Sequence, residues 1–88
     1  MNTVISPFAK KQLKKLPKLI QFSVAKKIRN LSLGIESSNI KSLTSYKNIY
    51  RIRINDYRMV YRILDKDIYI ILIAHRREVY LLLKRIFS

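Results

Sequence analysis

The sequence predicts one α+β domain, residues 1–88, with the element order βααβββα. Apolar side chains recur at helical spacing between residues 8 and 33, alternate with period two between residues 46 and 64, and return to helical spacing after residue 76. A chain of 88 residues is long enough for one hydrophobic core. We therefore expect an antiparallel sheet with an N-terminal helical hairpin on one face and a short C-terminal helix.

The N-terminal part predicts a short strand at Asn2–Ser6 and two helices after it. Ser6 and Pro7 begin the first helix, since a serine hydroxyl caps free N–H groups and proline fits the first helical turn. This helix covers Phe8–Leu16, and a second helix covers residues 17 to about 33. Each helix has an apolar stripe and a polar face, which predicts a helical hairpin packed on a sheet.

The C-terminal part predicts three strands and a last helix. The strands are expected at Tyr46–Ile54, Tyr57–Leu64 and Ile68–Ala74, and the helix from Arg76 onward. Before the first of these strands, Ile35–Ser45 is polar and rich in serine, which indicates a loop or an edge segment.

The last of these strands is apolar on both faces, so we expect it to be a central strand that is covered on both sides. Simple alternation assigns Ile70 and Leu72 to the core under the helical hairpin. It assigns Tyr69, Ile71 and Ile73 to the opposite face. That face would then be an apolar floor with a basic rim, which is a common form of binding site.

Arginines dominate the exposed face of the first two strands of the C-terminal part. Asn55 and Asp56 suit a two-residue turn, because both tolerate the positive φ that primed turns require. In that register Arg53 lies opposite Arg58, with Arg51 on the same face. Like charges that face each other across a strand pair are destabilising. An anionic partner such as a row of phosphates explains this array better than the fold does.

The charge balance points to the same kind of partner. The chain has 19 Lys and Arg against five Asp and Glu, a formal net charge of +14, which implies RNA, DNA, an anionic membrane surface or an acidic protein. The longest apolar run, residues 68–74, is too short to span a bilayer, and no signal-peptide core precedes Lys10. The absence of cysteine fits a reducing compartment. We expect a cytoplasmic protein with no membrane partner.

Three segments together resemble the RelE/ParE superfamily of bacterial toxins from type II toxin–antitoxin pairs. They are Tyr50-Arg-Ile-Arg-Ile54, Asp56-Tyr-Arg-Met-Val-Tyr61 and His75-Arg-Arg-Glu-Val-Tyr80, in that order. A Leu-Pro pair between the helices and the order of elements add to the resemblance, which covers essentially the whole chain.

The resemblance implies a function as well as a fold. RelE-like members are ribosome-dependent endoribonucleases that cut mRNA in the decoding site, whereas ParE-like members share the fold, inhibit DNA gyrase and lack the nuclease residues. The RelE-like branch implies that this chain acts on mRNA, with the ribosome and a cognate acidic antitoxin as partners. The alternatives are a ParE-like gyrase inhibitor and a non-catalytic RNA-binding module.

The resemblance also implies which residues do the work. In the nuclease branch these are basic side chains on the hairpin, an arginine after the last strand and a tyrosine that opens the final helix. Carried onto this sequence, the catalytic residues are Arg51, Arg53, Arg58, Arg76 and Tyr80, with His75 or Arg77 as alternatives for the post-strand position. The RNA-binding candidates are Arg51, Arg53, Arg77, His75, Lys10 and Lys14.

Two departures from the pattern of that branch concern three positions. The first two hairpin positions are lysine in its best-known members and are Arg51 and Arg53 here, which keeps the charge but removes a group that can deprotonate. The glycine usual before the His-Arg pair is Ala74.

The residue types favour a reaction without metal or cofactor. A metal site needs a cluster of imidazole, thiolate or carboxylate ligands, and the chain has one histidine, no cysteine and five carboxylates. In the metal-free route the 2′-hydroxyl of RNA attacks the adjacent phosphate and leaves a 2′,3′-cyclic phosphate and a 5′-hydroxyl. Arg58 and Arg76 suit stabilisation of the phosphoryl charge. Tyr80 is the expected base, because neighbouring cations favour a phenolate, and Glu78 and His75 remain as alternatives.

Each group also has a purely structural alternative. The hairpin arginines could be a solvated strand face, and Tyr80 could be a packing residue at a helix start. Arg62, farther along the same face, could pair with Asp67 or Glu36. Lys10 and Lys14 belong to a lysine-rich helix face, which is either solvated or in contact with ribosomal RNA.

Overall fold

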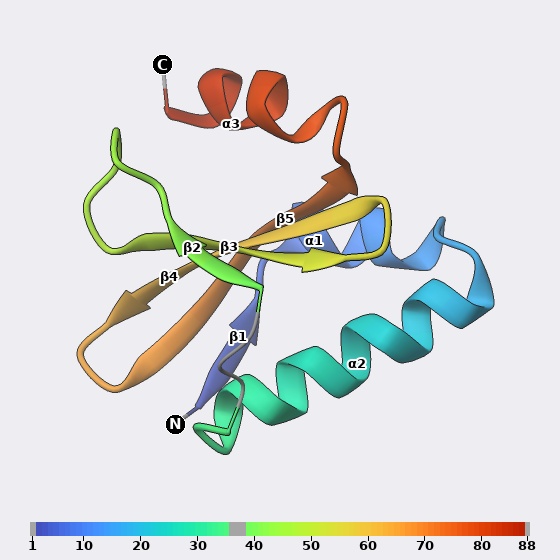
Figure 1. Ribbon diagram of the computed structural model, residues 1–88, viewed down its shortest axis with the longest axis horizontal. Helices are drawn as coiled ribbons and strands as arrows, with labels where there is room; N and C mark the ends of the chain where they lie inside the picture. Colours follow the sequence, from blue (N-terminus) through green and yellow to red (C-terminus); the bar gives the residue numbers. More distant parts are fainter. Residues whose placement is uncertain (1, 36–38, 88) are drawn as a thin grey trace.

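The computed structural model describes residues 2–35 and 39–87 and has the α+β class and the element order expected from the sequence, with one short edge strand added (Figure 1). The elements are β1 Thr3–Ile5, α1 Pro7–Lys14, α2 Lys18–Ser32, β2 Ile40–Ser42, β3 Ile49–Ile54, β4 Tyr57–Leu64, β5 Asp67–His75 and α3 Val79–Phe87. The sheet separates the α1–α2 hairpin from α3, so the protein has three layers.

The sheet has five strands in the order β1-β5-β4-β3-β2. Three of its pairs are antiparallel, but β1 and β5 run parallel, so the expectation of a wholly antiparallel sheet is wrong for this pair. Parallel neighbours need a long connection, which the two helices and the meander of strands after them provide. The edge segment expected at Ile35–Ser45 contains β2; its residues 36–38 lie outside the described residues.

The register of the β3–β4 hairpin is the expected one. Arg53 pairs with Arg58, and Arg51 pairs with Val60. Of the two turn residues only Asn55 has a positive φ, 54°, so the turn needs one left-handed residue and not two. Strand β3 is shorter than the expected Tyr46–Ile54, because residues 46–48 form a turn that precedes it.

A β-bulge at Ile71 changes which side chains of β5 face the helices. Two consecutive residues of β4 pair with Leu72 and Ile70, which leaves Ile71 without a partner on that strand. The extra residue reverses the alternation, so Ile73 lies in the core under the α1–α2 hairpin and Leu72 is buried on the α3 side. The expected faces of Leu72 and Ile73 are therefore wrong, whereas those of Ile70, Ile71 and Tyr69 hold.

Two apolar clusters fill the spaces on either side of the sheet. The larger lies under the hairpin and takes Ala9 from α1 and Val24 from α2. The smaller lies under α3 and takes Val79 and Leu83 from that helix. The expected apolar floor of the arginine face is thus largely covered by α3, which starts at Val79 and not at Arg76.

The side chains of Ser6, which caps α1, and of Gln12 complete the hydrogen bonding of β5 beyond the end of β1. The Ser6 hydroxyl caps α1 by accepting from the N–H of Ala9 at 3.0 Å, and it donates to the carbonyl of Ile71 at 2.9 Å. The side-chain oxygen of Gln12 accepts from the N–H of Ile73 at 2.7 Å. The bulged part of β5 therefore keeps its backbone groups paired although its neighbouring strand has ended.

Gln12 is expected to be a stability residue. Gln12→Leu should lower the free energy of unfolding by about 1–3 kcal/mol, because it leaves the buried N–H of Ile73 without an acceptor. Urea denaturation of the wild type and the variant measures this difference. Gln12→Glu keeps an acceptor at the same place and should lose less stability. Equal losses of stability in the two variants would contradict the role of Gln12 as the acceptor for Ile73.

Candidate functional site

Four arginines gather on the α3 side of the sheet, and we call them the arginine cluster: Arg51, Arg53, Arg58 and Arg76. Arg51 and Arg53 alternate along β3 with residues of the larger core, and Arg58 lies on β4 across from Arg53. Arg76 follows directly after β5. Three neighbouring segments of the sheet thus bring these side chains to one end of one face.

The electrostatics of Arg58 place Tyr80 beside this cluster. Burial lowers the pKa of Arg58, and the charges of Arg53, Arg51 and Arg76 lower it further. The Tyr80 phenol acts in the opposite direction and raises the pKa of Arg58. The other four residues for which the sequence suggested a catalytic role therefore all lie close enough to Arg58 to influence its ionisation.

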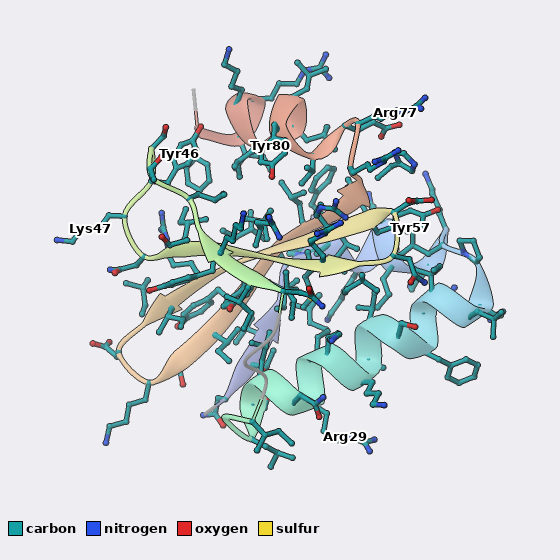
Figure 2. The ribbon with its side chains drawn as sticks, viewed as in Figure 1. Arg29, Tyr46, Lys47, Tyr57, Arg77 and Tyr80 are labelled. Atoms are coloured by element: carbon teal, nitrogen blue, oxygen red, sulfur yellow. The ribbon has the colours of Figure 1, made fainter. Side chains whose placement is uncertain are left out.

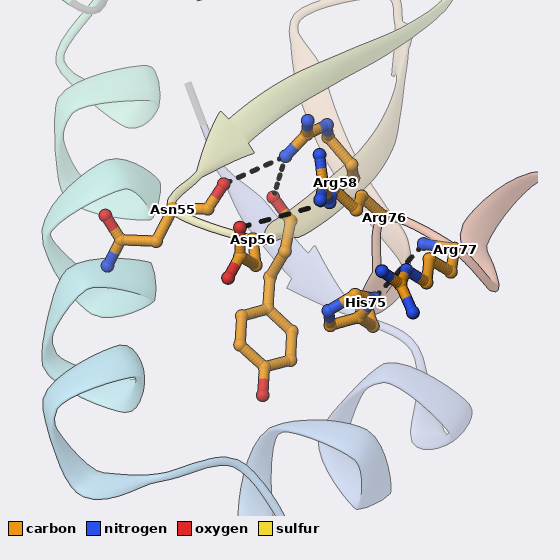
Figure 3. Close-up of polar contacts among 7 residues, drawn as sticks. Asn55, Asp56, Arg58, His75, Arg76 and Arg77 are labelled. Carbon is orange, nitrogen blue, oxygen red and sulfur yellow. Dashed lines mark hydrogen bonds and ion pairs between the residues drawn. The ribbon is translucent and has the colours of Figure 1, made fainter.

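The guanidinium of Arg58 is held by the turn between β3 and β4 (Figure 3). Its Nη1 donates to the carbonyl oxygens of Asn55 at 3.0 Å and Tyr57 at 2.9 Å. The same turn contacts Arg76, whose backbone N–H donates to the carbonyl of Asp56 at 2.8 Å and whose Nε lies 4.0 Å from the Asp56 carboxylate.

Tyr80 lies in the first turn of α3 and points toward the sheet (Figure 2). Its side chain is 50% exposed, while the buried contacts of α3 are made by Val79 and Leu83. Tyr80 and Tyr46 line a hollow of about 420 Å³ between α3 and the segment before β3. Tyr80 is therefore not a buried packing residue.

The two alternative bases lie elsewhere. His75 and Glu78 line a second hollow of about 370 Å³ together with Tyr57 and residues of α1. His75 makes an edge-on ring contact with Tyr57, at 5.7 Å between centroids, and its Nδ1 accepts from the N–H of Arg77 at 3.2 Å. The hollow faces α1, so these side chains and Tyr80 line different hollows.

The remaining candidate residues do not join the cluster. Lys10 and Lys14 are exposed on α1, which packs on the other side of the sheet. Arg77 is exposed in the turn before α3 (Figure 2). Arg62 shares the arginine face, but its guanidinium lies over the ring of Phe87, 5.5 Å from the centroid. Asp67 and Glu36 were the acidic partners expected for Arg62, and Glu36 lies outside the described residues.

Asp56 was expected only as a turn residue, and in the structure it also contacts Arg76. The signal was present, since Asp56 is one of five carboxylates in a chain of net charge +14 and lies at the tip of an arginine-rich hairpin. Within residues 2–35 and 39–87, His, Asp and Glu side chains form no group of three that could hold a metal ion. The same residues contain no helix long and apolar enough to cross a membrane.

Repulsion between Arg53 and Arg58 should be measurable as lost stability. Arg53→Thr is expected to raise the free energy of unfolding by about 0.5 kcal/mol, because it removes one of two like charges that face each other and puts a good strand former in its place. Thermal or urea denaturation at low salt measures the gain. Arg62→Thr is the control, since Arg62 is a strand arginine that faces Ile49 and Tyr69 and no cation; an equal gain there would argue against the cross-strand explanation.

Comparisons with known proteins agree with this geometry at the level of the fold. Residues 4–80 match the family model described as ParE toxin of type II toxin-antitoxin system, parDE. Comparison with the curated proteins gives no match.

Three solved structures illustrate the likeness. A chain of the RelB–RelE antitoxin–toxin complex from Methanococcus jannaschii is 24% identical, with a TM-score of 0.78 over 88% of this chain and 94% of that one. The isolated E. coli RelE toxin is 24% identical, with a TM-score of 0.74 over 97% of each chain. A chain of the archaeal RelE–RelB complex from Pyrococcus horikoshii OT3 is 26% identical, with a TM-score of 0.72 over 85% of this chain and 93% of that one.

Proposed function

Because this chain belongs to the ParE toxin family of type II toxin–antitoxin systems, within the RelE/ParE superfamily, we propose that it acts as a toxin of the RelE-like kind, a ribosome-dependent endoribonuclease that cleaves mRNA. The observation that carries the proposal is the convergence of the arginine cluster and Tyr80 around Arg58. A module that only binds RNA needs the cations but has no use for a phenol at that place.

The proposed reaction is an attack by the RNA itself. The 2′-hydroxyl oxygen bonds to the adjacent phosphorus, and the bond from phosphorus to the 5′ oxygen of the next nucleotide breaks. Arg58 and Arg76 stabilise the charge on the phosphoryl oxygens through fixed donors that stay protonated. The products are a 2′,3′-cyclic phosphate and a 5′-hydroxyl, and the steps require neither a metal nor a cofactor.

Two protons move in this reaction. Tyr80 is the proposed base and takes the proton of the 2′-hydroxyl, since it is the side chain beside the arginine cluster that can accept one. Arg51 and Arg53 contact the RNA backbone on the leaving-group side. They do not give up their own protons, so the 5′ oxygen receives its proton from solvent.

The ribosome and an antitoxin are the proposed partners. The site has no strong base, so free RNA should be cut slowly, and a message held and bent in the decoding site of the cytoplasmic ribosome should be cut fast. The net charge of +14 and the exposed arginine cluster fit a cognate acidic antitoxin that covers or distorts the site. Antitoxin–toxin complexes among the structures of similar fold support that partner.

Inhibition of DNA gyrase is the second candidate function. One observation favours it, since the family model that matches residues 4–80 is named for the ParE toxin. In that case the arginine cluster would form a protein-binding surface, and loss of the Tyr80 hydroxyl would have little effect on the inhibition of gyrase.

An in vitro translation assay with an end-labelled message tests the proposal. The purified protein should produce cuts in phase with the codons. A parallel supercoiling assay with purified gyrase tests the alternative. Intact message together with arrested supercoiling would rule out the nuclease.

A further inference from the structure

We propose that Asp56 is a positioning residue that holds Arg76 beside Arg58, so that both guanidinium groups face the same phosphate. The inference rests on the proposed function, because it gives the turn between β3 and β4 a task in the nuclease site. Asp56 itself need not touch the RNA.

The turn holds the two arginines in different ways (Figure 3). Arg58 is bound by two neutral groups, the carbonyl oxygens of Asn55 and Tyr57, at 3.0 and 2.9 Å. Arg76 is bound by the carbonyl of Asp56 through its backbone, at 2.8 Å, and by the Asp56 carboxylate 4.0 Å from its Nε. The carboxylate is therefore the group on this turn that acts on the Arg76 side chain.

A negative charge is needed at this place because the arginines repel each other. The charge of Arg76 lowers the pKa of Arg58, which means that the two cations are close enough to interact. The Arg76 side chain is 54% exposed, so repulsion alone would turn it away into solvent. An exposed ion pair adds little to the stability of a fold. Its effect here is on where Arg76 points, and orientation of a catalytic group can change a rate strongly.

The alternative is that Asp56 is an ordinary turn residue, and the two interpretations predict different results. A bystander carboxylate next to an RNA site repels phosphate, so its removal should strengthen RNA binding and leave the rate of cleavage unchanged or higher. A positioning carboxylate should lower the rate when it is removed, even though RNA binding does not weaken.

Asp56→Asn separates these cases, since asparagine keeps the size of the side chain and the preference for a turn. We expect the single-turnover rate of message cleavage on ribosomes to fall roughly five- to tenfold. Affinity for a short RNA with 2′-O-methyl groups, which cannot be cut, should stay the same or rise. Asp65→Asn is the matched control, because Asp65 is exposed in the β4–β5 turn and the change in charge is identical. Equal cleavage rates in the two variants would overturn the proposal.

A double-mutant cycle tests whether Asp56 acts through Arg76. In the Arg76→Ala background, Asp56→Asn should cause no further loss of rate. If Asp56→Asn costs the same factor with and without the Arg76 side chain, the positioning role is wrong.

A measurement on the free protein keeps this test separate from that of the nuclease. The Nε–H of Arg76 should exchange with solvent faster in Asp56→Asn than in the wild type, as observed by NMR, and should be unaffected in Asp65→Asn. If the wild type cuts no message, the proposed function fails, and this exchange rate still decides whether Asp56 holds Arg76. Equal exchange in all three proteins would overturn the positioning role even if the protein proves to be a nuclease.

Discussion

Arg58→Ala is expected to slow cleavage of the message on ribosomes by about a hundredfold to a thousandfold. Arg58 and Arg76 are the two proposed contacts to the phosphoryl oxygens, and Arg58 is the one whose pKa is lowered by the charges of the other three arginines of the cluster. Two carbonyl oxygens hold its guanidinium in place before RNA binds, so the variant should lower the cleavage rate more than the affinity for RNA. Single-turnover cleavage of an end-labelled message measures the effect.

Two variants control for charge and shape. Arg29→Ala removes the same charge from the exposed side of α2, far from the cluster, and should leave the rate almost unchanged (Figure 2). Arg58→Lys keeps the charge but loses the planar pair of donors, so its rate should lie between those of the wild type and Arg58→Ala. If Arg29→Ala and Arg58→Ala lower the cleavage rate by the same factor, net charge alone explains the activity.

Tyr80→Phe is expected to lower the cleavage rate by about a hundredfold, because it removes the proposed base and keeps the ring. The affinity for uncut RNA should remain, since the aromatic face and the cations are unchanged. The measurement is the single-turnover rate at saturating ribosome concentration, compared with binding of the same 2′-O-methyl RNA.

Tyr46→Phe is the matched control for Tyr80. Tyr46 lines the same hollow, and its ring lies tilted against that of Phe87, so loss of its hydroxyl alters the surroundings without touching the proposed base. Glu78→Gln and His75→Ala test the alternative bases, which line a different hollow. Cleavage at the wild-type rate by Tyr80→Phe, together with an inactive Glu78→Gln or His75→Ala, would move the base to the other side of the sheet.

The β3–β4 hairpin could be predicted in detail because its information is local. Strict alternation fixes which side chains share a face, and a two-residue turn fixes which residues pair, so the facing of Arg53 and Arg58 followed from the sequence. The information that predicts the helical hairpin is equally local, since Ser6 caps α1 as expected and accepts from the N–H of Ala9.

The arrangement of β5 could not be predicted because both of its faces are apolar. Where every residue in a strand is apolar, alternation does not show which side chains share a face. The bulge at Ile71 exchanges the faces of Leu72 and Ile73, and the sequence contains no signal for it. The parallel pairing of β1 with β5 is a long-range choice of the same kind.

The site was predictable in part. The hairpin pattern placed Arg51, Arg53 and Arg58 together, but only the fold brings Arg76 and Tyr80 to the same end of the sheet. No spacing rule in the sequence joins a residue of α3 to one of β4. The same limit explains Lys10 and Lys14, whose charge suggested RNA binding but whose helix packs on the far side of the sheet.

The proposed reaction needs a 2′-hydroxyl at the cleaved nucleotide, and a message with a single 2′-deoxynucleotide at that position tests this requirement. With no 2′-hydroxyl at that nucleotide, we expect no cut there on translating ribosomes, while the all-ribose message is cut and yields a 2′,3′-cyclic phosphate. A cut at the deoxynucleotide, with the same position and rate as in the all-ribose message, would contradict the proposed reaction.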